Sequence, residues 1–293
     1  MKYTILSIFF CLLSVSMLGQ NDSLQLNSED YLQTIDSINK TFQYQYGKIQ
    51  LGNNIACIHV PEGYKFLNAG QSNYLLTELW ENPPSEVLGM LFREDNHPLS
   101  LIPSYAVGIT YSKDGYINDE DAKEIDYDEL LREMKKDTKN ANIERSENGY
   151  PTIELIGWAS EPFYDEVSKK LHWAKELKFS NSENNTLNYN IRILGRKGYI
   201  NLNAVGNMET LPQFQQDAEK ILASIEFNNG YKYREFNPNI DKLASYGIGG
   251  LISGKVLAKA GFFELIEKFW KVILIVTLGI VALFAKKIFG SKI

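Results

Sequence analysis

Two uncharged hydrophobic runs lie near the ends of the chain, and a long region of alternating apolar and polar residues lies between them. The first run extends from Ile5 to Val15 and follows Lys2. A basic start, an apolar run too short to span a bilayer and then small or polar residues are the parts of a secretory signal. We therefore expect residues 1–19 to be a signal peptide, cleaved after Ser16 or after Gly19.

The second run is Val272 to Ala285, and lysines lie on both sides of it. If the flanking lysines snorkel, Phe269 to Phe289 provides the roughly 20 residues that cross a hydrocarbon core of about 30 Å. Phe269 and Trp270 stand where an interfacial aromatic anchor is expected. The sequence predicts a transmembrane anchor over residues 266–293.

The region between the runs carries both strand and helix periodicity. Helical stripes are expected in 31–42, 70–80, 126–134 and 211–225, and strands in 49–59, 87–92, 104–111, 152–159, 170–179, 187–194, 199–205 and 231–236. This order predicts an α+β fold, with antiparallel sheet packed against helices. Its last part, a hairpin of long strands and then an amphipathic helix ending at 223–227, resembles the PsbP-like α/β/α sandwich.

The organisation that follows has five parts. They are a signal peptide at 1–19, a polar or amphipathic segment at 20–46, an exported α+β domain at 47–236, a Gly/Ala-rich juxtamembrane segment at 237–265, and the anchor with a short tail at 266–293. Removal of the signal leaves Cys57 as the one cysteine, so no intrachain disulfide is expected. The net charge is −6 and the chain has no long basic cluster, which argues against a nucleic-acid partner.

Several short motifs together resemble a bacterial membrane-anchored family, catalogued as domain of unknown function 2167. They are Gly89-Met90, Tyr111, Asp114-Gly115-Tyr116, Asp121-Ala122, Gly157-Trp158-Ala159 with Pro162 and Tyr164-Asp165, Leu187-Asn188-Tyr189 with Ile191 to Arg196, and Asp241-Lys242 with Tyr246-Gly247. The resemblance covers about Gly47 to the C-terminus. It implies an export signal, one soluble domain and a C-terminal anchor, and it supplies no catalytic residues.

Titratable residues give little indication of chemistry. An acidic stretch runs from Asn118 to Glu129, but its spacing does not fit a calcium loop, and a helix-capping role is favoured. His59, His97 and His172 lie on separate segments and have no metal-ligand spacing. We expect no metal site and no cofactor.

The most unusual stretch is 157–165, which ends in Tyr164 and Asp165. Pro162 is expected to end the strand, and Arg192 or Arg196 to pair with Asp165. Two interpretations stay open. One is a strand-end turn held by a salt bridge, and the other is a ligand groove formed by Trp158, Tyr164, Asp165, Arg192 and Arg196. Arg192 and Asn190 fall opposite the apolar face of their strand, so they need partners if helices cover that face.

The juxtamembrane segment places small residues one helical turn apart, at Gly250, Gly254 and Ala258. Such spacing lets helices approach closely, so a self-association face and a homo-oligomer are expected. Lys255 and Lys259 argue against a simple membrane span. A second span remains the alternative.

We therefore expect a single-pass protein of the bacterial inner membrane, anchored at its C-terminus with the main domain in the periplasm. The favoured function is a non-enzymatic binding or scaffold module, with an envelope protein as a further partner. The alternatives are an envelope hydrolase that uses Asp119, Asp121 or Asp165, and a small-ligand or lipid sensor near Trp158.

Overall fold

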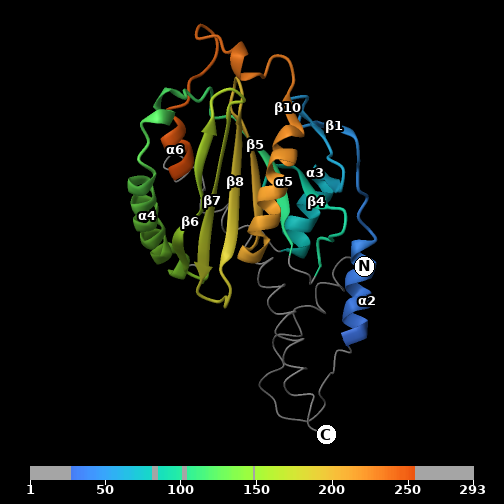
Figure 1. Ribbon diagram of the computed structural model, residues 1–293. Helices are drawn as coiled ribbons and strands as arrows, with labels where there is room; N and C mark the ends of the chain where they lie inside the picture. Colours follow the sequence, from blue (N-terminus) through green and yellow to red (C-terminus); the bar gives the residue numbers. More distant parts are fainter. Residues whose placement is uncertain (1–27, 81–84, 101–103, 148, 255–293) are drawn as a thin grey trace. The chain divides into compact units, whose positions relative to one another are not determined.

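The computed structural model describes residues 28–80, 85–100, 104–147 and 149–254 (Figure 1). The chain divides into two units between Thr41 and Phe42, and each is described by itself. In the first, helix α2 covers Ser28–Asn39, which confirms the expected N-terminal helix. The signal peptide and the anchor lie outside the described residues. Within those residues, no helix combines the length and the apolar character needed to cross a membrane.

A seven-stranded antiparallel sheet forms the centre of the second unit, with strand order β3-β4-β5-β9-β8-β7-β6 (Figure 1). Its strands are β3 (Tyr64–Asn68), β4 (Val87–Arg93), β5 (Ala106–Ser112), β6 (Ile153–Asp165), β7 (Lys170–Phe179), β8 (Thr186–Leu194) and β9 (Tyr199–Asn207). Three short strands, β1 (Lys48–Leu51), β2 (Ala56–His59) and β10 (Ile225–Phe227), form a second sheet in the order β1-β2-β10. Antiparallel sheets packed with helices confirm the predicted α+β class.

One face of the large sheet is apolar, and we call it the α5 face. Strand register brings Phe66, Leu91, Val107, Ala204 and Tyr189 into one row across it. All five belong to the buried core that also contains Phe214, Ala218 and Ile221 of helix α5 (Leu211–Ala223), which lies across the sheet in Figure 1. These three positions form the apolar stripe expected from the sequence, and their burial is the main source of stability here.

The opposite face carries polar side chains at its centre, and we call it the polar face. Its rows run through β5, β9, β8 and β7, and they contain Thr110, Trp173, Lys175, Asn188, Asn190, Arg192, Asn201 and Asn203. At the β3–β4 end of the sheet, α3 (Ala69–Tyr74) and a π-helical turn, η1 (Leu75–Leu79), pack near β4. At the other end, α4 (Tyr127–Glu147) and α6 (Ile248–Ser253) lie together beside β6 (Figure 1).

Two details of the expected elements are wrong. Pro162 does not end its strand, because β6 continues to Asp165 through three shifts of register against β7. An edge strand has one unpaired side, and bulges accommodate a residue that has no N–H. The segment 231–236 is not a strand either, because Tyr233–Glu235 forms a 3-10 turn, η4, in which the Glu235 carboxylate accepts bonds from the N–H groups of Gly230 and Lys232.

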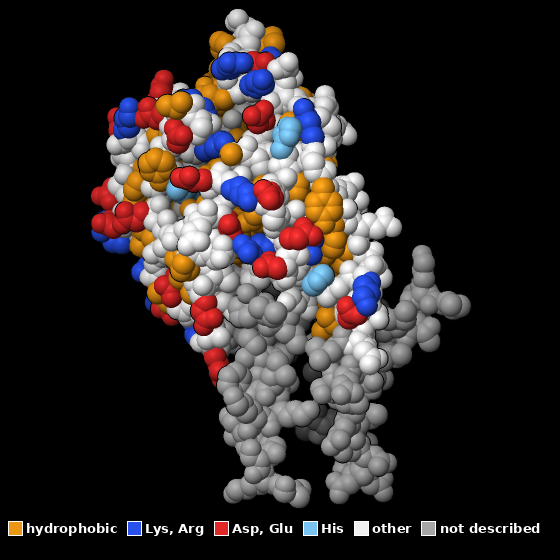
Figure 2. Space-filling model, turned by 45° about the vertical axis from the view of Figure 1, so that its right-hand side comes forward, with side chains coloured by type: hydrophobic (Ala, Val, Ile, Leu, Met, Phe, Trp, Pro, Cys, Tyr) orange, Lys and Arg blue, Asp and Glu red, His pale blue; other side chains and the backbone are white. Residues whose placement is uncertain are grey.

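The face shown in Figure 2 mixes both signs of charge. Lys and Arg side chains lie next to Asp and Glu side chains, with hydrophobic groups between them. Such a surface suits a soluble folded domain, and it does not form the one-signed footprint of a nucleic-acid-binding protein.

Candidate functional site: the cap and the polar face

Two chain segments far apart in the sequence meet beyond one end of the large sheet, and we call them the cap: residues 113–126 and 231–254. Their backbones pair directly, since Tyr116 N–H donates to Lys242 O at 2.8 Å and Ala244 N–H donates to Tyr116 O at 2.8 Å. Gly115 has φ +106°, and a Cβ there would lie 2.6 Å from Lys242 O. Only glycine suits this crossing.

Asp119 is the polar centre of the cap. Its Oδ2 accepts from Tyr164 at 2.7 Å and from Lys169 Nζ at 2.6 Å, and the Tyr233 hydroxyl lies 2.8 Å from its Oδ1. Burial opposes ionisation of this carboxyl, but the bonds from Lys169, Tyr164 and Tyr233 hold the pKa of Asp119 below its usual value. Asp119 therefore stays ionised and ties both cap segments to the β6–β7 turn.

Aromatic stacking adds a second set of contacts within the cap. The Tyr116 ring lies 4.3 Å from the Tyr233 ring and 3.9 Å from the Phe236 ring, measured between centroids. Both pairs are stacked, so Tyr116 joins the first cap segment to the second.

Asp121 fixes the start of α6. Its two carboxylate oxygens accept from the N–H groups of Ile248 at 2.9 Å and Gly249 at 3.0 Å. A Cβ on Gly247 would lie 2.5 Å from Asp121 Oδ1, so glycine permits this approach. Asp114 accepts a hydrogen bond from the Tyr246 hydroxyl, immediately before α6. The glycines 247 and 249 therefore serve packing inside the domain.

The five expected groove residues do not form one groove. Tyr164 lies in the cap on Asp119, while Trp158 Nε1 donates to Tyr127 O at 3.3 Å, beside α4. Arg192 is buried on the polar face. Arg196 pairs with Asp241 at 2.7 Å.

The expected pairing of Asp165 with Arg192 or Arg196 is wrong. Asp165 accepts from Ser168 Oγ at 2.6 Å and from the N–H of Val167 at 2.8 Å. These local bonds lower the pKa of Asp165, Ser168 contributing most, and they close the turn between β6 and β7. The strand-end turn is therefore correct, but side-chain and backbone donors within the turn hold it in place of an arginine.

Arg192 is the most unusual group on the polar face, because the residue is 3% exposed and forms no ion pair with any described residue. Its NH1 donates to Asn201 Oδ1 and to Ile191 O, and its NH2 lies 3.5 Å from Asn190 Oδ1. Its Nε has no acceptor within the part of the chain that the structure describes. Burial lowers the pKa of Arg192, but an arginine stays protonated in proteins.

Two aromatic rings lie beside this guanidinium, and a second buried cation lies on the same face of the sheet. The guanidinium carbon lies 5.0 Å from the Trp173 ring and 5.6 Å from the Tyr199 ring, within cation–π range. Lys175, also 3% exposed, lies across from Asn188 on the same face, and the Trp173–Asn190 row separates it from the row of Arg192. Burial, followed by the charge of Arg192, lowers the pKa of Lys175 to about 7.

The sequence indicated only part of this arrangement. It placed Arg192 and Asn190 opposite the apolar face and required partners for them, which the structure confirms. It did not identify Lys175, although that lysine interrupts the apolar side of its strand, formed by Leu171, Trp173 and Leu177. A charge at an inward position of an otherwise apolar face was the available signal.

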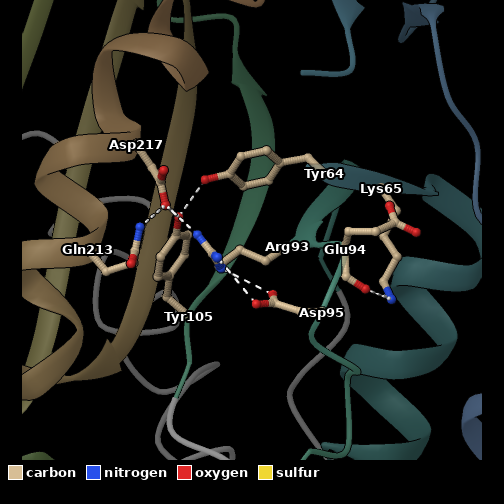
Figure 3. Close-up of polar contacts among 8 residues, drawn as sticks. All are labelled: Tyr64, Lys65, Arg93, Glu94, Asp95, Tyr105, Gln213 and Asp217. Carbon is tan, nitrogen blue, oxygen red and sulfur yellow. Dashed lines mark hydrogen bonds and ion pairs between the residues drawn. The ribbon is translucent and has the colours of Figure 1, made fainter. Parts of the chain in front are cut away.

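A separate polar network fastens α5 to the sheet (Figure 3). Asp217 Oδ2 accepts from Tyr105 at 2.5 Å, Arg93 at 2.9 Å and Gln213 at 3.0 Å. Because Tyr105 gives its proton to Asp217, Tyr64 is the donor in the 2.6 Å contact between the two hydroxyls. Burial, and then the bond to Asp217, raise the pKa of Tyr105. The network contains an ionised acid and neutral phenols, and its hydrogen bonds hold α5 against the sheet.

No group of three or more metal-ligating side chains gathers in the part of the chain that the structure describes. His172 Nδ1 lies 2.9 Å from the Tyr189 hydroxyl, and burial lowers the pKa of His172. Cys57 is buried in β2. These groups occupy ordinary structural positions.

The expected self-association helix differs from the structure in one respect. Helix α6 ends at Ser253, and Gly254 takes a left-handed conformation with φ +70° at its C-cap. Within α6, a Cβ on Gly250 would lie 2.7 Å from Tyr246 Cβ, so that glycine faces its own domain. Ala258 lies outside the described residues. Self-association through these positions stays a prediction.

Comparison with known proteins identifies a family and, among solved structures, distant structural likenesses. A family model described as "Protein of unknown function (DUF2167)" matches residues 43–283. The solution structure of cyanobacterial PsbP (CyanoP) from Synechocystis sp. PCC 6803 is similar at 9% identity and a TM-score of 0.36, over 63% of this chain and 92% of that chain. No curated protein matches the chain.

Proposed function

Since the chain belongs to the DUF2167 family, whose description assigns no activity, we propose from its geometry a non-enzymatic binding or scaffold module. In this proposal the protein is exported and anchored in the bacterial inner membrane by residues 266–293. Its main domain lies in the periplasm and binds an envelope component. Self-association through Gly250, Gly254 and Ala258 is part of the same proposal.

One observation supports binding over hydrolysis: the carboxylates of the cap are used as internal hydrogen-bond acceptors. Asp119 accepts from two tyrosines and a lysine, Asp121 from the first N–H groups of α6, and Asp114 from Tyr246. A general acid or base must reach a substrate proton with a free lone pair or a proton of its own. Two of the three acids that the hydrolase alternative would use, Asp119 and Asp121, are instead engaged in holding 231–254 in place.

The same contacts support a scaffold role. Residues 231–254 lead from the sheet toward the expected anchor, and three carboxylates and the Tyr116 stack hold them. A tether that leaves a fastened segment would orient the domain relative to the bilayer, whereas a loose linker would leave it free to rotate.

The test compares the cap acids with a matched surface acid in the full-length protein in membranes. Asp119→Ala should lower the free energy of unfolding by about 2–3 kcal/mol, because two phenols and an ammonium lose their shared acceptor. Asp137→Ala, on an exposed position of α4, should change it by less than about 0.5 kcal/mol. In cells, the full-length protein should crosslink to a defined partner at the membrane. Asp121→Ala should weaken this crosslink by releasing α6, and Asp137→Ala should leave it unchanged.

Three results would contradict the proposal. The intact chain could be recovered from the soluble fraction, or the domain could be accessible from the cytoplasm. Alternatively, Asp119→Asn could abolish hydrolysis of an envelope substrate while stability stays unchanged, which is the behaviour of a catalytic acid rather than of a fastening group.

A further inference from the structure

We propose that the polar face of the large sheet binds one oxyanion, a carboxylate or a phosphate group, against Arg192 and Trp173. The inference rests on the proposed binding function, and it names the chemical class of a ligand for that function. The evidence is the set of unpaired hydrogen-bond donors and the buried positive charge around Arg192 and Trp173.

Two buried hydrogen-bond donors at this site have no acceptor among the described residues. They are Arg192 Nε and Trp173 Nε1, and their residues are 3% and 1% exposed. Leaving a buried donor unpaired costs about 1–3 kcal/mol, and almost all such groups in native proteins have a partner. An acceptor outside the described part of the chain is therefore expected near these two N–H groups.

The neighbouring amide side chains do not supply this acceptor, because they bond to one another and to NH1. Asn188 Nδ2 donates to Asn203 Oδ1 at 3.1 Å, and Asn190 Nδ2 donates to Asn188 Oδ1 at 2.8 Å. Asn201 accepts from Arg192 and donates to Thr110 Oγ1 at 3.2 Å. The amides form a chain that orients the guanidinium and leaves Nε available.

Charge decides the kind of acceptor. Arg192 is buried and has no ion pair with any described residue. A buried cation is costly unless an anion neutralises it. Water would satisfy the donors but would not neutralise the charge. An oxyanion does both, and the planar fork of an arginine matches carboxylate and phosphate geometry.

The size of the bound group is limited because Arg192 is 3% exposed and Trp173 is 1% exposed. A compact group fits, either as a free ion or as the head of a larger molecule such as an anionic lipid. The two sources share the same chemistry, so the experiment includes an arm for each.

The experiment uses the full-length protein in a neutral detergent, titrated calorimetrically with inorganic phosphate and, separately, with acetate, at ionic strength held constant with chloride. A third arm measures binding to phosphatidylglycerol vesicles, with phosphatidylcholine vesicles as the reference. Two variants perturb the site gently. Arg192→Lys keeps the charge and removes the fork, and Trp173→Phe keeps a ring and removes one N–H. Arg132→Lys, on an exposed position of α4, is the matched control.

Saturable one-site binding is expected in at least one arm. Arg192→Lys should weaken it tenfold or more and Trp173→Phe about tenfold, while Arg132→Lys should leave it unchanged. Binding of phosphate or acetate identifies a free oxyanion, and binding confined to phosphatidylglycerol identifies a headgroup. The proposal is overturned if no arm saturates, or if both site variants bind like the wild type. If no anion site is found but the protein still crosslinks to its membrane partner, only the proposed anion site is wrong. If the crosslink is also absent, the proposed binding function is wrong as well.

Discussion

The two faces of the large sheet are built from alternate residues of the same strands, yet they differ in the interactions that their side chains make. On the α5 face, the Tyr189 ring lies 4.5 Å from the Phe214 ring, Ala204 belongs to the same core, and this core gains stability from buried apolar area. On the polar face, the adjacent residues Asn190 and Asn203 belong to an amide chain around a buried guanidinium. A fold that needed only stability would not bury Arg192 there. The α5 face therefore accounts for folding, and the polar face is where a ligand is expected.

The largest expected effect concerns the α5 face. Phe214→Ala should lower the free energy of unfolding by about 3–5 kcal/mol, because a fully buried ring is lost beneath the sheet and a cavity remains. Denaturant unfolding of the full-length protein measures this change, and added phosphate should stabilise the variant by the same amount as the wild type. A loss of the phosphate effect in Phe214→Ala would show that the two faces are not independent.

The next effect concerns pH and the polar face. The pKa of Lys175 is about 7 in the fold, against 10.5 for an ordinary lysine, so between these values the unfolded chain binds more protons. Stability should therefore rise as the pH increases from 7 to 9, by about 2–3 kcal/mol, and the penalty should be fully present below pH 7. Lys175→Met should remove this rise. A wild-type stability that falls over the same interval would contradict the assignment.

The smallest effect concerns the network that fastens α5. Tyr105→Phe removes the hydroxyl that donates to Asp217, and it should cost about 1 kcal/mol because Arg93 and Gln213 still bond to that carboxylate. Thermal unfolding measures the loss. Anion binding should not change, since Tyr105 belongs to the buried core of the α5 face. Weakened binding in this variant would extend the site to both faces.

Much of the fold follows from the sequence because periodicity reports burial. The stripe of α5 and the alternation in β8 were sufficient to place both elements and their apolar faces. The end of β6 was predicted incorrectly, because a bulged edge strand tolerates Pro162 and no local rule distinguishes that case from a strand end. The segment 231–236 has aromatic residues typical of a strand, but a tertiary arrangement uses them for stacking on Tyr116.

The site is less predictable because it depends on long-range contacts. Asp119 was considered as a hydrolytic acid, and only the fold shows that Tyr164, Lys169 and Tyr233 converge on it. Arg192 was paired with the wrong partner, because proximity to Asp165 was inferred from position along neighbouring strands. A charged residue opposite an apolar face does predict a need for partners, and it does not say which partners the fold provides.

The most direct test of the central claim, that the polar face binds an oxyanion, observes the Nε–H group of Arg192 itself. Side-chain Nε–H signals of arginine can be recorded in ¹⁵N–¹H spectra, and the Arg192 signal is identified by its absence in Arg192→Lys. With inorganic phosphate or, in a second titration, phosphatidylglycerol vesicles, we predict a saturable shift of this signal and of the Trp173 Nε1–H signal, while Arg132 does not move. If both signals stay fixed in both titrations, or move only as Arg132 does, the polar face does not bind an oxyanion and the account is contradicted.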